Sequence, residues 1–375
     1  MGNRTPAEIF APGDFINEEL DARGWSQLEL AEVLARPPKL VSELIAAKRA
    51  ITPETARGLG AAFGTGPEFW MNLERDYRLS KTVHDDDSVE RRSKLYGKTP
   101  VKEMMKRGWV EPSQNINVLQ KRVLDFLQVS DIDDEPWIAH AAKKGSYDRV
   151  SPAQWAWLFR VRQLAREFSV PQYSKSALED ALPMLEALLT APEEARHVPR
   201  ILSACGLRFV IVEKLPMADI DGVCCWLDEH SPVIGMSIRR DKIDNFWFVL
   251  RHEIEHVLQG DGKETAVIDA SLEGERAGTG LSLPVEERVA NAAAADFCVP
   301  TRKLDSFLAR KRPFFYERDV VAFARLLNRH PGLIVGQMQF RLNNYSYLTK
   351  HLVRIRQFVL TGAIVDGWDQ VPSIG

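Results

Sequence analysis

The stretch Phe246-Trp-Phe-Val-Leu-Arg-His252-Glu253-Ile-Glu-His256 combines apolar side chains with the pattern H-E-x-x-H. Two histidines four positions apart lie on one face of a helix, so His252 and His256 can reach one cation together. Glu253 lies beside them and can take a proton from the water that such a cation activates. The surrounding apolar residues predict a buried helix, in which a polar cluster needs a partner. The stretch therefore predicts a metal site; the alternative is a solvent-facing helix with two unrelated histidines.

A zinc hydrolase of this kind needs three protein ligands and one open position for water. Residues 285–298 predict a second helix, which offers Glu286, Glu287 and Asp296. A run of alanines lets this helix approach a neighbour closely, and Glu287 lies one turn before that run. We expect Glu287 to be the third ligand, with Glu286 as the second candidate. The alternative is that both glutamates are exposed charges favoured by the dipole at the helix start.

The composition is that of a folded protein, with 375 residues, 45% hydrophobic and 27% charged, and it allows two or three domains. The formal net charge is −3, so any contact with nucleic acid must come from a local patch. No run of about 18 apolar residues predicts a membrane span, and the first residues lack the apolar stretch of a secretory signal. The four cysteines lack the spacing of a disulfide framework. We therefore expect a cytoplasmic protein without membrane contact.

Three apolar, β-branched runs at 207–213, 222–228 and 232–238 predict strands of a small sheet. A long helix is expected at 244–259, followed by a glycine-rich loop at 260–284. A loop of this length could cover a neighbouring site. The rest of the chain is predicted to be mostly helical, so the expected fold class is α+β, mostly helical, with a small β-sheet.

The N-terminal region predicts short, closely spaced helices. Ser26 and Glu29 form a capping box at the start of one helix. After a short break, another helix is expected at 38–46, and Thr52 is expected to cap the next. Two short helices joined by a tight turn and braced by others form a helix-turn-helix, whose second helix enters the major groove of DNA.

The stretch 241–256 resembles the catalytic helix of ImmA/IrrE-type metallopeptidases, and the pattern E-x-x-A-N at 287–291 resembles the second helix of that family. The resemblance covers roughly residues 195–340. It implies a zincin-like peptidase fold, Zn²⁺ as the cofactor, and the glutamate at position 287 as the third zinc ligand. The sequence departs from the family at Ala293, where phenylalanine is common.

The segment 329–336 resembles one that often follows the second helix in such peptidases. Its histidine, His330, could stabilise a tetrahedral intermediate. The alternative is a structural histidine that caps the preceding helix.

The N-terminal region resembles the XRE-type helix-turn-helix of HigA-like antitoxins. The residues that carry this resemblance are Pro12-Gly13-Asp14, Trp25-Ser-Gln-x-Glu-Leu-Ala31, Ser42-Glu-Leu-Ile45, Lys48-Arg-Ala-Ile-Thr-Pro-Glu-Thr55 and Gly64-Thr-Gly-Pro-Glu-Phe-Trp70. The resemblance implies that Pro38, Lys39 and Ser42 lie at the exposed start of the recognition helix. It also implies that Gln27 and Lys48 meet DNA phosphates.

Three features depart from that pattern, and one of them is Pro37-Pro38, which makes the recognition helix stiff at its start. Ala35 stands in the turn where glycine is usual, and residues 1–78 hold nine Lys/Arg against twelve Asp/Glu. Because attraction to phosphate rises with the local number of cations, we expect weak, salt-sensitive nonspecific affinity, which a homodimer would strengthen by doubling the contacts. The alternative is a helix-turn-helix kept for protein–protein contact alone.

The expected organisation has four parts. They are a helix-turn-helix DNA-binding domain at 1–80, a helical connecting domain at 81–195, an ImmA/IrrE-like zinc metallopeptidase core at 196–310 and a C-terminal helical extension at 311–375. The expected function is a regulator that binds a double-stranded operator and cleaves a protein partner such as a repressor. The first alternative is a non-catalytic antitoxin or regulator whose C-terminal domain binds a toxin or senses a ligand. The second is an antitoxin whose middle segment neutralises a toxin directly.

Overall fold

The structure is a computed structural model that describes residues 10–81, 87–134, 150–263, 266–269 and 284–369. The chain divides into two compact units, residues 1–89 and 90–375. The boundaries expected near 195 and 310 stay predictions. Among the described helices, none combines the length and the apolar character needed to cross a membrane.

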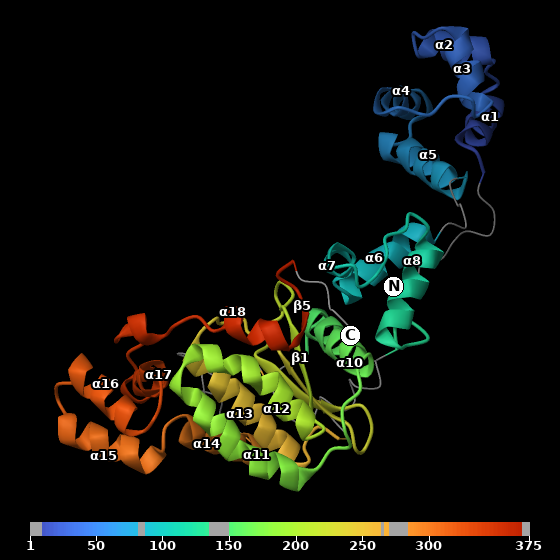
Figure 1. Ribbon diagram of the computed structural model, residues 1–375. Coiled ribbons are helices and arrows are strands. Elements are labelled where there is room, and N and C mark those ends of the chain that lie inside the picture. Colours follow the sequence, from blue (N-terminus) through green and yellow to red (C-terminus); the bar gives the residue numbers. More distant parts are fainter. Residues whose placement is uncertain (1–9, 82–86, 135–149, 264–265, 270–283, 370–375) are drawn as a thin grey trace. The chain divides into compact units, whose positions relative to one another are not determined.

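The first unit is entirely helical in its described part (Figure 1). Its helices are α1 (Pro12–Arg23), α2 (Gln27–Val33), α3 (Pro38–Ile45), α4 (Pro53–Phe63) and α5 (Pro67–Lys81). Its core is small and continuous, since Ile16, Leu30, Val41, Leu59 and Trp70 are all fully buried in one cluster. Each helix contributes one of these five side chains, so the core holds the helix-turn-helix in a fixed frame.

The caps predicted for this unit are confirmed. Ser26 accepts a hydrogen bond from the backbone N–H of Glu29, whose carboxylate accepts one from the N–H of Ser26. Thr52 caps α4 through the N–H of Thr55. The turn between α2 and α3 passes through Ala35, whose φ of +50° lies in the left-handed region that favours glycine. Alanine in place of the usual glycine therefore still forms the turn, but the backbone at Ala35 is strained.

The second unit holds the remaining elements. Its helices are α6 (Ser88–Lys98), which leads into it, α7 (Val101–Lys106), α8 (Ile116–Leu127), α10 (Pro152–Arg166), α11 (Lys175–Ala187), α12 (Val198–Ala204), α13 (Ile243–Gln259), α14 (Val285–Cys298), α15 (Thr301–Lys311), α16 (Glu317–Leu326), α17 (Pro331–Leu342) and α18 (Arg356–Val359). Short 3-10 turns lie at η1 (Leu188–Thr190), η2 (Pro192–His197), η3 (Thr349–His351) and η4 (Leu360–Gly362). The helices expected at 244–259 and 285–298 are confirmed as α13 and α14.

The sheet has the order β4-β2-β3-β1-β5 and is mixed. Its strands are β1 (Arg208–Val212), β2 (Gly222–Trp226), β3 (Pro232–Met236), β4 (Val267–Asp269) and β5 (Ile364–Asp366). β1 runs parallel to β3 and β5, whereas β2 runs antiparallel to β3 and β4. The three predicted strands are confirmed, and two more were not predicted.

The two additional strands correct the sequence analysis. β4 lies inside the stretch expected to be a loop, 260–284, of which 264–265 and 270–283 lie outside the described residues. β5 lies in the stretch 311–375, so the expectation of helix there is wrong for this strand. Both strands are three residues long, too short for alternation to mark them, and both form by pairing with distant segments.

Helices cover both faces of the sheet. Phe209 and Ile211 of β1 point into the apolar cluster that contains α13, whereas Val210 and Val212 point into the cluster that contains α10. Successive side chains of a strand face opposite ways, so one short strand joins both clusters. α13 is buried along almost its whole length against the sheet, α14 and α17.

Asp244, in the first turn of α13, is buried against α17. A Cβ on Gly336 of α17 would lie 2.5 Å from its Oδ2 atom, so the glycine makes room for the carboxyl group. Oδ1 has no hydrogen-bond partner among the described residues. Burial raises the pKa of Asp244 to about 6, because the charged form is poorly solvated there.

We predict that Asp244→Asn stabilises the second unit at neutral pH. The folded carboxyl holds its proton more tightly than the unfolded one, so its contribution is favourable in acid and is lost as pH rises through about 6. The variant should gain about 1–3 kcal/mol in free energy of unfolding at pH 7.5 and little at pH 4.5. Urea unfolding at both pH values measures this, with the exposed Asp180→Asn as control. Equal destabilisation at both pH values would contradict the account.

Candidate functional site

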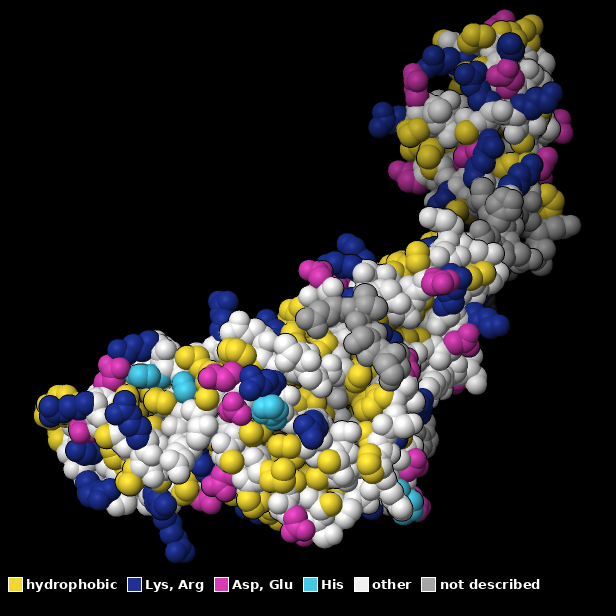
Figure 2. Space-filling view, in the orientation of Figure 1, with side chains coloured by type: hydrophobic (Ala, Val, Ile, Leu, Met, Phe, Trp, Pro, Cys, Tyr) yellow, Lys and Arg dark blue, Asp and Glu magenta, His cyan; other side chains and the backbone are white. Residues whose placement is uncertain are grey.

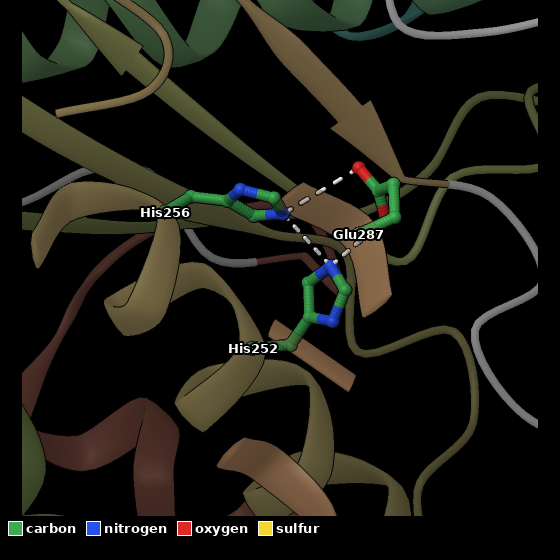
Figure 3. A group of neighbouring side chains, drawn as sticks. All are labelled: His252, His256 and Glu287. Atoms are coloured by element: carbon green, nitrogen blue, oxygen red, sulfur yellow. Dashed lines mark hydrogen bonds and ion pairs between the residues drawn. The ribbon is translucent and has the colours of Figure 1, made fainter. Parts of the chain in front are cut away.

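Two helices bring the three predicted metal ligands together. His252 and His256 come from α13, and Glu287 comes from α14 (Figure 3). The Nε2 atoms of the histidines are 3.0 Å apart, and the carboxylate oxygens of Glu287 lie 3.4 Å from Nε2 of His252 and 3.5 Å from Nε2 of His256. Both histidines are fully buried, and Glu287 is 8% exposed. The three side chains form a buried group that could hold a metal ion.

The two helices approach closely because α14 presents small side chains. Ala290 and Ala294 of α14 are fully buried, and Glu287 precedes Ala290 by about one turn, so it faces the same way. Glu286, the second candidate, is exposed and lies outside the group, as does the exposed Asp296. The solvent-facing alternative for α13 is wrong, since all but its last residue are buried.

Glu253 is fully buried and lies against the first residue of β2. A Cβ on Gly222 would lie 2.1 Å from Oε1 of Glu253, closer than real side chains approach, so glycine at this position leaves the space that the carboxylate occupies. The neighbouring Glu255 has a different environment. Burial raises its pKa, but hydrogen bonds from Gln259 and Arg251 outweigh that effect, so its pKa is lowered and it stays a carboxylate.

Asp261 is a site residue that the sequence analysis missed. Its Oδ2 atom lies 2.9 Å from Nδ1 of His256, on the side of the ring away from the other two ligands. Gly260 ends α13 with a φ of +79°, which turns the chain back so that Asp261 reaches the last turn of the helix. A carboxylate in this place fixes the orientation of a ligating imidazole. The available signal was an aspartate directly after a helix-ending glycine.

β2 also anchors the turn that carries Asp261. The indole N–H of Trp226 donates to the backbone carbonyl of Asp261 over 2.7 Å. Gly262 has a φ of +80°, and a Cβ there would lie 2.7 Å from the carbonyl oxygen of Cys224. One strand therefore supports both Glu253, at its first residue, and Asp261, at its last.

His330 lies outside the ligand group. Its Nδ1 atom accepts a hydrogen bond of 3.1 Å from the N–H of Gly332, so it caps the helix that follows it, α17. The expectation of a cap on the preceding helix is therefore wrong. Burial lowers the pKa of His330, which keeps the ring neutral and able to accept this bond.

The five predicted DNA-contacting residues are all exposed in the first unit. Pro38 and Lys39 begin α3, and Ser42 follows one turn later with its hydroxyl donating to the carbonyl of Lys39. Gln27 begins α2, and Lys48 lies in the turn after α3. The opposite face of α3 is buried through Val41 and Leu44, so the exposed face is available for a groove.

Comparisons with known proteins concern a short part of the chain. No family model matches it. The HTH-type transcriptional regulator YddM of Escherichia coli is 37% identical over 70 residues, which is 19% of this chain and 74% of that protein. The chain belongs to this family of HTH-type transcriptional regulators through its N-terminal segment.

Two further matches involve segments of similar size. Virulence-associated protein I of Dichelobacter nodosus is 33% identical over 88 residues, 23% of this chain and 80% of that protein. The solved structure of the Pseudomonas aeruginosa antitoxin HigA with the higBA promoter is 31% identical and covers 20% of this chain and 82% of that chain, with a TM-score of 0.19. Each of these matches covers at most 23% of the chain.

We predict that Asp261→Asn weakens metal binding. Losing the negative charge behind His256 lowers the basicity of that ligand and loosens its orientation, which typically costs about 10–100-fold in affinity. Competition with a chromophoric zinc chelator measures the affinity. The exposed Asp228→Asn, outside the ligand group, is the control and should bind like the unaltered protein. Equal affinity of Asp261→Asn and the control would show that Asp261 does not support the site.

Proposed function

We propose that this chain is a DNA-binding transcription regulator whose second unit is a zinc-dependent endopeptidase of the ImmA/IrrE type. The observation that carries the peptidase half is the buried convergence of His252, His256 and Glu287. Two imidazoles and one carboxylate are the ligands of catalytic zinc sites that keep a fourth position open. Zn²⁺ held by these residues would supply Lewis acidity that polarises a peptide carbonyl and activates a water.

The protein's own residues would then do three things. Glu253, held in the space beside Gly222, accepts a proton from the attacking water and delivers it to the nitrogen of the leaving amine. Asp261 holds the imidazole of His256 by its Nδ1 atom. Glu255, the other buried glutamate on this part of α13, accepts hydrogen bonds from Arg251 and Gln259. Of the two glutamates, Glu253 is therefore the one proposed as the base.

The DNA-binding half rests on membership in a family of HTH-type regulators and on the exposed face of α3. In the proposal, Pro38, Lys39 and Ser42 meet base edges of a double-stranded operator, while Gln27 and Lys48 meet phosphates. The protein would act as a cytoplasmic homodimer, because two-fold symmetry doubles a weak set of contacts. Its peptidase would cleave a protein partner such as a repressor.

A second candidate function is a non-catalytic antitoxin or regulator that binds a toxin or senses a ligand. One observation favours it. Leu28 and Val33 of α2 are 57% and 52% exposed. Exposed apolar side chains on a helix-turn-helix suit a protein partner. In this case zinc would be structural or absent, and Glu253 would have no chemical task.

Zinc binding tests the ligand assignment on which the peptidase candidate depends. We predict about one zinc per unaltered chain, loss of binding by at least 100-fold in Glu287→Gln, and no change in the neighbouring Glu286→Gln. Elemental analysis and chelator competition measure both quantities. Equal zinc binding by Glu286→Gln and Glu287→Gln would contradict the ligand assignment.

Cleavage itself is tested by comparing the unaltered protein with Glu253→Gln in cell extracts. The variant keeps all three ligands and should bind zinc normally, yet it should produce no new protein N-termini, because it lacks the base. Labelling of new N-termini followed by mass spectrometry identifies the substrate. Identical sets of N-termini from both proteins would favour the non-catalytic candidate.

Recognition of a specific operator sequence is tested by incubating genomic DNA fragments with the full chain and sequencing those that stay bound. We expect a palindromic motif whose half-sites lie about one helical turn apart, reflecting a dimer. A variant carrying Lys39→Ala and Ser42→Ala should lose the enrichment of that motif. Retention without any common motif would contradict sequence-specific binding.

A further inference from the structure

The end of the second unit is strongly basic. Residues 301–356 contain twelve Lys/Arg and only three Asp/Glu, a formal charge of +9 in a chain whose net charge is −3. In Figure 2, Lys and Arg side chains gather over the end of this unit where α15 and α16 lie. The total charge of the chain conceals this local excess.

The three carboxylates of this region are already engaged. Asp319 pairs with Lys311 at 3.1 Å, Asp305 pairs with Arg341 at 3.1 Å, and Glu317 pairs with Lys350 at 2.7 Å. Within residues 302–325, six exposed cations remain that pair with no carboxylate among the residues that the structure describes. They are Arg302, Lys303, Arg310, Arg312, Arg318 and Arg325, here called the basic surface.

The packing of α15 against α16 keeps the cations of the basic surface exposed to solvent. Arg302 and Arg310 are eight residues apart on α15, so they share a face and lie about 12 Å apart along the helix. Arg318 and Arg325, seven residues apart, share a face of α16. The apolar sides of the two helices meet below, where the rings of Phe307 and Phe323 stack with centroids 4.4 Å apart. The cations are therefore fixed on a packed scaffold and not on a loose tail.

We propose that the basic surface binds the phosphate backbone of duplex DNA without sequence preference. This inference rests on the proposed DNA-binding function, which it completes. The first unit is net acidic over residues 1–78, so it can read bases but contributes little phosphate neutralisation. Five of the six cations are arginines, whose planar guanidinium matches phosphate oxygens in a two-pronged contact.

Other polyanions fit the observations less well. An amphipathic helix that binds a lipid surface needs a free apolar face, but Leu304, Phe307 and Phe323 bury that face in the core. Single-stranded RNA is bound by rows of open aromatic rings on which successive bases stack. Here the ring of Tyr316 is covered by the guanidinium of Arg318 at 5.4 Å, which leaves Phe314 as the exposed ring beside the basic surface. Duplex DNA is also the polymer that the first unit is proposed to bind, and binding by one part of a chain raises the effective concentration of the polymer for the other part.

The test uses the full chain and a random-sequence duplex of about 30 base pairs, so that base reading contributes nothing. The variant carries Arg302→Gln, Arg310→Gln, Arg318→Gln and Arg325→Gln. Its matched control carries Lys102→Gln, Lys121→Gln, Lys175→Gln and Arg200→Gln, four exposed cations elsewhere in the same unit. The variant and its control have the same net charge, so a difference in their affinity for DNA shows that the position of the four cations matters. The pairs Arg302/Arg310 and Arg318/Arg325 are also changed separately, in case the fourfold variant folds poorly.

We expect the fourfold variant to lose at least tenfold in affinity near 0.1 M salt, and the slope of log K against log salt to fall by about 3. The control should stay within about twofold of the unaltered protein. Each double variant should lose an intermediate amount. Equal binding by the variant and the control would overturn the inference.

Two further arms separate the possible failures. A variant with Lys39→Gln and Lys48→Gln disables the proposed reading surface. If it loses the operator motif but keeps the salt-dependent binding of random duplex, both proposals stand. If the unaltered protein shows no motif yet the basic-surface variant still loses random-duplex binding, only the proposed operator reading fails. If the basic-surface variant loses more affinity for phosphatidylglycerol vesicles or single-stranded RNA than for duplex DNA, the assignment to DNA is overturned.

Discussion

The close contact between α13 and α14 is the constraint on which the second unit depends. Buried imidazoles and a buried carboxylate are costly unless they satisfy one another or a metal ion. Here His252, His256 and Glu287 meet because Ala290 and Ala294 let the two helix backbones approach. A larger side chain at either alanine would separate the helices and leave buried polar groups without partners. The same contact between the two helices therefore determines both the packing of the core and the geometry of the ligand group.

The strand β2 connects that interface to the sheet. Its first residue, Gly222, gives space to Glu253, and its last residue, Trp226, holds the carbonyl of Asp261. Both neighbours of β2 in the sheet pair with it in antiparallel fashion, and the helices on the two faces bury it completely. The expected base and the residue behind His256 are thus supported by one rigid element, which suits a site whose geometry must not change during a reaction.

The sequence allowed the metal-ligand group to be predicted because helical spacing is local. His252 and His256 are one turn apart on any helix, and the choice of Glu287 over Glu286 followed from the alanines that succeed it. The capping box of Ser26 is local in the same sense. β4, β5 and Asp261 were missed because each depends on a partner distant in sequence or on the direction in which a turn leaves a helix.

The distribution of charge on the surface could not be predicted from the sequence either, because it depends on how the helices pack. The sequence-level balance of −3 suggested weak attraction to nucleic acid, but the fold gathers arginines from α15 and α16 on one surface while pairing the nearby acids. A first unit poor in cations and a surface of the second unit rich in them would divide recognition and affinity between two parts of one chain. A regulator built in this way would keep its expected peptidase on DNA.

The central claim is that α13 and α14 form a zinc site of two histidines and one glutamate. X-ray absorption at the zinc edge, on the full chain loaded with one equivalent of zinc, tests it most directly. We expect about four nitrogen or oxygen neighbours at about 2.0–2.2 Å, with the outer-shell signature of two imidazoles. A six-coordinate oxygen shell without imidazole scattering, or a shell containing sulfur, would contradict the account.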